Sequence, residues 1–224
     1  MSAVTERRTA PFVVPFAVFA AILVVAPRLS LSPRVLGAGW LVVMAVVIAV
    51  WSRGVVSFRL ERPLGTALLG VGVFLLWIGP DLLIPGYRDG WLFQNAVTGR
   101  AESSFPAEGR GDLLALLLRF ARAAVVVPIA EELFWRGWLP RWVDRPDGFA
   151  EAPLGRYTAW SFGVTALLFA AEHGAFWDVG LLAGVAYNWW LIRTRSLGDL
   201  IWCHAITNGC LSAYVIWGGH WQYW

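Results

Sequence analysis

Long apolar segments recur along the whole chain, and they restrict its fold more than any other feature. Of the 224 residues, 58% are apolar and 15 are tryptophan, and the mean hydropathy is +0.60. Soluble domains do not have this profile. The segments have the length of transmembrane helices rather than strands. The sequence therefore predicts an all-α, polytopic integral membrane protein.

Seven apolar segments are visible, at residues 11–26, 35–51, 64–84, 113–139, 158–173, 179–192 and 197–217. We expect about seven transmembrane helices from them, although the fifth and sixth segments are short for a complete crossing. The loop at 88–111 holds Trp91, Phe93 and Phe105 among charges, and an eighth element would lie there on the membrane surface. No repeat or soluble domain is visible, so we expect a single transmembrane domain over 1–224.

Basic residues set the expected orientation. The chain has no lysine, and its arginines are spread among short loops, a pattern that suits membrane topology rather than nucleic-acid binding. With a cytoplasmic N-terminus, ten arginines fall on the inner side (residues 7, 8, 53, 59, 62, 141, 145, 156, 193 and 195) and five on the outer side. The positive-inside rule therefore predicts that the N-terminus is cytoplasmic.

Two adjacent carboxylates and an arginine interrupt the fourth segment, at Glu131, Glu132 and Arg136. Charged side chains inside a membrane are expensive, and they mark either a functional site or an internal ion pair. In a helix Glu132 and Arg136 share a face and can pair, whereas Glu131 points elsewhere and has no local partner. Glu131 is therefore a candidate general base or acid. The alternative is that these charges, together with Arg119 and Arg122, only hold helices together.

Two histidines follow on later apolar segments. His173 lies one helical turn after Phe169, and His204 lies one turn before Asn208, so that each pair shares a helix face. A single membrane histidine is often only an interhelical hydrogen-bond donor, but two of them beside a mid-membrane Glu pair favour a site. Glu131, His173 and His204 also form a possible ligand set for a divalent metal such as zinc. The zinc-protease spacing H-E-x-x-H is absent, so the sequence does not require a metal.

The three motifs occur in a fixed order: Glu131-Glu132-x-x-x-Arg136, Phe169-x-x-x-His173 and His204-x-x-x-Asn208. In that order they resemble the CPBP family, the CAAX-protease and bacteriocin-processing intramembrane peptidases. The resemblance covers a core of about 112–217 and no part of the first three segments.

This resemblance implies an intramembrane endopeptidase in which Glu131 and His173 activate water and His204 and Asn208 stabilise the oxyanion. It also implies supporting roles for Glu132, Arg136 and Phe169. The family has been argued to be of the metallo type and of the glutamate type, and both remain open here.

The residues within and around these motifs resemble those of a family subgroup that is associated with bacterial exosortase-type protein sorting. It consists of Glu-Glu-Leu-Phe-Trp-Arg-Gly-Trp from Glu131, Tyr187-Asn188-Trp189 and a Trp-rich tail. The resemblance implies a multi-pass enzyme of the bacterial inner membrane that cuts the C-terminal tail of a membrane protein or peptide. Its implied partners are that substrate, the lipid bilayer and an exosortase-type system, and no nucleic acid.

The depth of His173 conflicts with this assignment if the fifth segment crosses the membrane straight. Arg122 and Arg141 bracket the Glu pair and place it near mid-depth, whereas His173 lies 17 residues beyond Arg156, near the outer face. A tilted or re-entrant hairpin over 158–192 would bring His173 back. Glu172 is a further candidate for the carboxylate role.

The function that we predict is hydrolysis of a peptide bond near or within the membrane by Glu131-activated water. One alternative is a proton-coupled transporter that uses the buried Glu and His residues as a relay. The other is a non-catalytic scaffold in which the polar residues join helices.

Overall fold

The computed structural model describes residues 3–224, with side chains described from Arg8 onward. Residues 1–2 of the expected domain and the side chain of Arg7, one of the inner arginines, lie outside this description. The described residues contain no β-strand, only an isolated bridge between Asn95 and Gly99. The predicted all-α membrane fold is confirmed.

Helices cover all seven apolar segments. They are α1 (Ala3–Val25), α2 (Pro33–Val47, continued by a π-helical turn Ile48–Ser52), α3 (Pro63–Leu83), a long helix Leu113–Asp144, α7 (Ala159–Glu172), α8 (Trp177–Thr194) and α9 (Leu197–Gly218). The long helix consists of α4 (Leu113–Ala121), α5 (Val127–Glu132) and α6 (Leu139–Asp144), joined by π-helical segments Arg122–Val126 and Leu133–Trp138. Within the described residues, five helices are long and apolar enough to cross a membrane, and α7 is a shorter apolar helix.

Side-chain caps explain where several helices begin. Ser32, Asp112, Thr158 and Ser196 each accept a hydrogen bond from a backbone N–H in the first turn of the helix that follows. Such caps satisfy backbone donors that have no partner inside the helix. Asp112 also pairs with Arg34 at the start of α2, and this hydrogen bond holds the pKa of the Asp112 carboxyl below its ordinary value.

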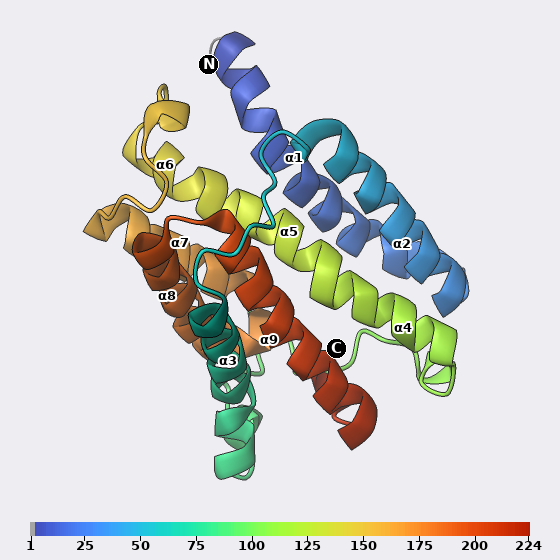
Figure 1. Cartoon of the computed structure of the whole chain (residues 1–224). Coiled ribbons are helices and arrows are strands. Elements are labelled where there is room, and N and C mark those ends of the chain that lie inside the picture. Colours follow the sequence, from blue (N-terminus) through green and yellow to red (C-terminus); the bar gives the residue numbers. More distant parts are fainter. Residues whose placement is uncertain (1–2) are drawn as a thin grey trace.

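The long helix divides the molecule into two groups of helices (Figure 1). On one side α1 and α2 pack against α4, α5 and the π-helical segments. On the other side α9 packs against α5 and α7 packs against α6, while α3 and α8 complete this second group. Glu132 and Arg136, which face this second group, are fully buried against residues of α7, α8 and α9.

Exposed apolar side chains mark the surface that faces lipid. On α3, Leu64, Leu68 and Leu75 are exposed and point outward, at spacings close to whole helical turns. Such a continuous apolar surface is unusual for a soluble monomer and is expected for a helix in a bilayer.

The loop between α3 and α4 does not form the eighth element that the sequence left open. It contains only the single 3₁₀ turns Tyr87–Asp89 and Ala107–Gly109, apart from the Asn95–Gly99 bridge. Phe93 and Phe105 are buried and serve local packing, whereas Trp91 is exposed.

A glycine sets the close approach of α3 to α9 and gives a first prediction. A Cβ added at Gly70 would lie 2.7 Å from the carbonyl oxygen of Cys203 and 2.9 Å from Cβ of Ile206, whereas one added at Gly72 meets nothing within 4 Å. We expect Gly70→Val to lower the free energy of unfolding by about 1–3 kcal/mol, because the two helices must separate. SDS titration in mixed micelles measures this change.

Gly72→Ala on the same helix is the matched control. It adds a methyl group in open space and removes a helix-interior glycine, so we expect unfolding free energy to stay constant or to rise by up to about 1 kcal/mol. Equal effects of the two substitutions would contradict the close helix approach at Gly70.

Candidate active site

The Glu pair lies where the long helix is irregular. Glu131 and Glu132 end the short α5, and a π-helical segment lies on each side of it, at Arg122–Val126 and Leu133–Trp138. Wider π turns inside α-helices are frequent at functional sites, because they rotate the side chains that follow and loosen backbone hydrogen bonding. Both carboxylates are buried, with exposed fractions of 5% for Glu131 and 0% for Glu132.

Glu132 and Arg136 form the predicted ion pair. An Arg136 guanidinium nitrogen donates to Glu132 Oε1 over 3.1 Å, and Arg136 Nε donates to Asn188 Oδ1 on α8 over 3.1 Å. The guanidinium also stacks over the Phe169 ring, 4.2 Å from its centroid. Glu132 Oε1 is 2.8 Å from Nδ1 of His204 as well. Glu132 thus links α5, α8 and α9 through Arg136 and His204, with both contacts on Oε1, while its buried Oε2 has no hydrogen-bond partner among the described groups.

Glu131 projects into a cavity of about 120 Å³ among α3, α5, α7, α8 and α9. One water needs about 10–15 Å³ of such volume, so the cavity has room for water and for part of a substrate. Its Oε2 atom is buried and has no hydrogen-bond partner among the described groups. The residues that line the cavity are Trp77, Val127, Glu131, Phe169, His173, Ala183, Tyr187, His204, Thr207, Asn208 and Leu211.

His173 lines the same cavity from the C-terminal end of α7. Its Nδ1 lies 2.6 Å from the backbone oxygen of Phe169, and a carbonyl only accepts, so the proton is on Nδ1. The lone pair of Nε2 is then free to accept a proton. The rings of Phe169 and Trp77 lie 4.5 Å and 5.1 Å from the imidazole, between centroids, and hold its orientation.

The depth conflict disappears because α6 and α7 share one end. Thr158 Oγ1, at the start of α7, donates to Asp144 Oδ1 at the end of α6 over 2.7 Å. Glu131 lies 13 residues from Asp144 and His173 lies 15 residues from Thr158. At 1.5 Å per residue both are about 20–22 Å from the shared end. Therefore α7 needs no re-entrant turn to bring His173 to the cavity.

His204 and Asn208 face the cavity from one side of α9. Glu132 engages Nδ1 of His204, so only Nε2 remains for a substrate. Asn208 Nδ2 donates one hydrogen to the carbonyl oxygen of Ala123 over 2.9 Å, inside the first π-helical segment. An amide carries two such hydrogens, so the second is available to the cavity.

Three further cavity residues were not predicted as site residues. Tyr187 donates from its hydroxyl to Thr207 Oγ1 over 2.8 Å, and its ring lies 5.2 Å from that of His204. Trp77 closes the cavity beside His173. Polar Tyr187 and Thr207 inside apolar segments were a readable signal, whereas nothing in the sequence pairs Trp77 of the third segment with the later motifs.

Two further predictions from the sequence concern Glu172 as a carboxylate candidate and a metal-ligand set. Glu172 is exposed and does not line the cavity. The metal candidates Glu131, His173 and His204 all line the cavity. Among the described residues, however, no three His, Cys, Asp or Glu side chains converge closely enough to hold one ion.

A comparison with known protein families identifies the same part of the chain that contains nearly all cavity residues of α5, α7, α8 and α9. Residues 113–210 match the family model described as type II CAAX prenyl endopeptidase Rce1-like. The matched region runs from the start of the long helix into α9 and contains all three motifs, which confirms the predicted resemblance. No curated protein and no solved structure matches the chain.

Proposed function

We propose that this protein hydrolyses a peptide bond, because residues 113–210 match the family model of Rce1-like type II CAAX prenyl endopeptidases. The family indicates an intramembrane endopeptidase with a membrane-embedded protein substrate. The observation that carries the proposal is the cavity that Glu131, whose Oε2 has no partner, shares with two imidazoles and an amide.

In the proposed reaction a water molecule in the cavity attacks the carbonyl carbon of the scissile bond. Glu131, whose Oε2 atom has no partner, accepts a proton from that water as general base. His173 Nε2, the free acceptor of a ring fixed through Nδ1, orients the water. The protonated Glu131 then gives the proton to the amine that leaves when the tetrahedral intermediate collapses.

The negative charge of that intermediate needs hydrogen-bond donors. The second amide hydrogen of Asn208 and a proton on Nε2 of His204 are the proposed donors. Glu132 Oε1, which Arg136 also contacts, accepts from Nδ1 of His204 and so fixes the imidazole with Nε2 toward the cavity. Preorganised donors of this kind are worth several kcal/mol of transition-state stabilisation each.

The substrate that we propose is a membrane-associated protein cut near its C-terminal tail, within an exosortase-type sorting system. The sequence of Glu131–Trp138 and the Trp-rich tail resemble the exosortase-associated subgroup, and this resemblance supports the choice of substrate. We further propose the bacterial inner membrane with a cytoplasmic N-terminus, for which the ten-to-five arginine distribution is the support.

The test compares protein C-termini in cells that hold equal amounts of wild-type protein, Glu131→Gln or Glu108→Gln. Glu108→Gln is the matched control, because it removes an exposed carboxylate in the loop before α4, outside the cavity. We expect a defined set of processed C-termini to disappear with Glu131→Gln alone. Processing by Glu131→Gln at the wild-type level would refute the proposal. Unchanged termini together with a growth or uptake defect would favour the proton relay instead.

A further inference from the structure

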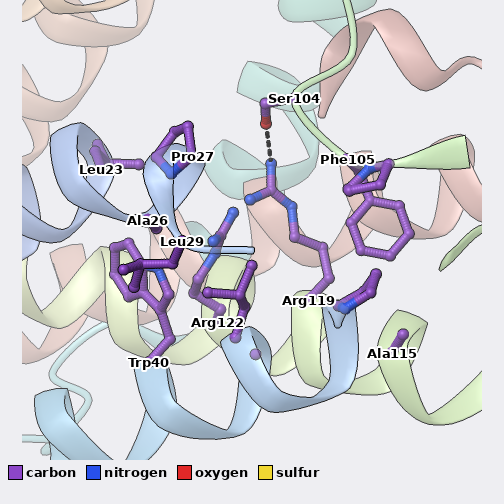
Figure 2. A pocket seen from close by; sticks show the side chains of 14 residues that line it. Leu23, Ala26, Pro27, Leu29, Trp40, Ser104, Phe105, Ala115, Arg119 and Arg122 are labelled. Atoms are coloured by element: carbon purple, nitrogen blue, oxygen red, sulfur yellow. Dashed lines mark hydrogen bonds between the residues drawn. The ribbon is translucent and has the colours of Figure 1, made fainter. Parts of the chain in front are cut away.

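Two membrane-embedded arginines lie outside the active-site cavity and take no part in the proposed reaction. Arg119 and Arg122 are three residues apart on the long helix, and both point into a second pocket against α1 and α2 (Figure 2). Arg122 precedes Glu131 by nine residues, which is about 13 Å along the helix. The pocket, called here the Arg119–Arg122 pocket, is therefore separate from the cavity that holds Glu131.

Neither guanidinium group has an acidic partner among the described side chains. Arg119 donates to Ser104 Oγ over 3.1 Å, and its Nε atom is buried without any partner. Arg122 lies over the Trp40 ring, 4.7 Å from the centroid. The neighbouring Arg34 is neutralised by Asp112. The pocket therefore holds two positive charges that have no acidic partner, near the end of the long helix that the loop residue Ser104 contacts.

The rest of the pocket is mainly apolar. Leu23, Pro27, Leu29, Leu36 and Phe105 contribute to its walls, and its volume is about 260 Å³. This is below the 300–1,000 Å³ or so of pockets that enclose a drug-sized ligand, so it suits a headgroup rather than a whole lipid. Leu23 and Leu29 are exposed at its edge. An acyl chain attached to a bound headgroup would thus continue along an apolar surface.

We propose that the Arg119–Arg122 pocket binds the phosphate of an anionic phospholipid, with the acyl chains lying against the exposed faces of α1 and α2. Two N–H groups of one arginine guanidinium can donate to two oxygens of the same phosphate. Basic pockets between membrane helices bind anionic lipid headgroups in this way. A soluble phosphate would use the two charges but leave the apolar walls uncovered. Bound lipid would supply the counter-charge and fasten α1 and α2 to the long helix.

Lipid binding to the delipidated, purified full chain tests this proposal without reference to peptidase activity. Native mass spectrometry measures the affinity for phosphatidylglycerol, for zwitterionic phosphatidylcholine, and for phosphatidylglycerol in competition with inorganic phosphate. We expect one phosphatidylglycerol to bind more tightly than phosphatidylcholine. Arg119→Gln/Arg122→Gln is expected to weaken phosphatidylglycerol binding about ten- to thirtyfold, since each arginine near an anionic lipid contributes about a factor of five.

Arg62→Gln/Arg193→Gln is the charge-matched control, because both arginines are exposed on loop and helix ends away from the pocket. A second variant, Ala26→Phe, keeps both charges and fills the pocket, and it is also expected to weaken binding. Ala26→Phe keeps the test decisive if loss of both arginines prevents folding.

Equal losses in the Arg119/Arg122 and the control variants would overturn the proposal, and so would wild-type binding by Ala26→Phe. Displacement of phosphatidylglycerol by inorganic phosphate at comparable concentrations would show a soluble-anion site and contradict the lipid assignment.

Discussion

Glu131→Gln and His173→Gln are each expected to lower the turnover number for peptide-bond hydrolysis about 10²–10⁴-fold, the usual contribution of general acid–base catalysis. Both side chains line the one cavity, and the free Nε2 of His173 complements the unpartnered Glu131 carboxylate. Because they act on the same water, the double variant should be about as slow as the slower single variant. Turnover by purified protein in liposomes at saturating substrate measures these values.

The control for this series is again Glu108→Gln, which should retain near-wild-type turnover because Glu108 is exposed in the loop before α4 and outside the cavity. Losses that multiply in the double variant would mean that Glu131 and His173 act independently. Such an outcome would contradict the shared-water mechanism.

Arg136→Met is expected to give the largest loss of stability, about 3–5 kcal/mol in the free energy of unfolding. Arg136 is fully buried, and its guanidinium contacts Glu132, Asn188 and the face of Phe169. Its removal leaves the Glu132 carboxylate buried without its cationic partner. SDS titration in mixed micelles again measures the change.

Two comparisons separate this effect from a general effect of losing arginine. Arg193→Gln removes an exposed arginine and should change unfolding free energy by no more than about 0.5 kcal/mol. Adding Glu132→Gln to Arg136→Met removes the uncompensated charge and should restore part of the loss. An Arg136→Met protein as stable as wild type would contradict the role of the buried pair.

Features that depend on short-range periodicity could be predicted from the sequence. The apolar segments predicted every helix, because a bilayer demands long apolar runs. The i, i+4 spacing predicted the Glu132–Arg136 pair, and the same spacing places His204 and Asn208 on one face of α9. The separation of Glu131 from that pair also followed from helix geometry alone.

Features that depend on packing between helices could not be predicted in this way. The depth of His173 was estimated from Arg156, whereas the hydrogen bond between Thr158 and Asp144 sets the common level of α6 and α7. The π-helical segments around Glu131 have no sequence signature of their own. The partnership of Trp77 with His173 joins segments almost a hundred residues apart.

The loop after α3 shows a third kind of difficulty. Its aromatic residues resembled a surface-lying element, but one of them, Phe93, lies against the buried guanidinium of Arg88 instead. This guanidinium lies over the rings of Phe93 and Phe176 and pairs with Asp81 and Asp178. Composition alone does not distinguish aromatic residues that meet lipid from those that enclose a cation.

The most direct test of the proposed reaction is hydrolysis in H₂¹⁸O by purified protein in liposomes. The substrate is a membrane protein whose processed C-terminus depends on Glu131 in cells. With wild-type protein we predict cleavage and one ¹⁸O atom in the new C-terminal carboxylate, detected by mass spectrometry, and with Glu131→Gln at equal amount we predict no labelled product. Labelled product formed equally fast by Glu131→Gln, or no cleavage by the wild-type protein, would contradict peptide hydrolysis by Glu131-activated water.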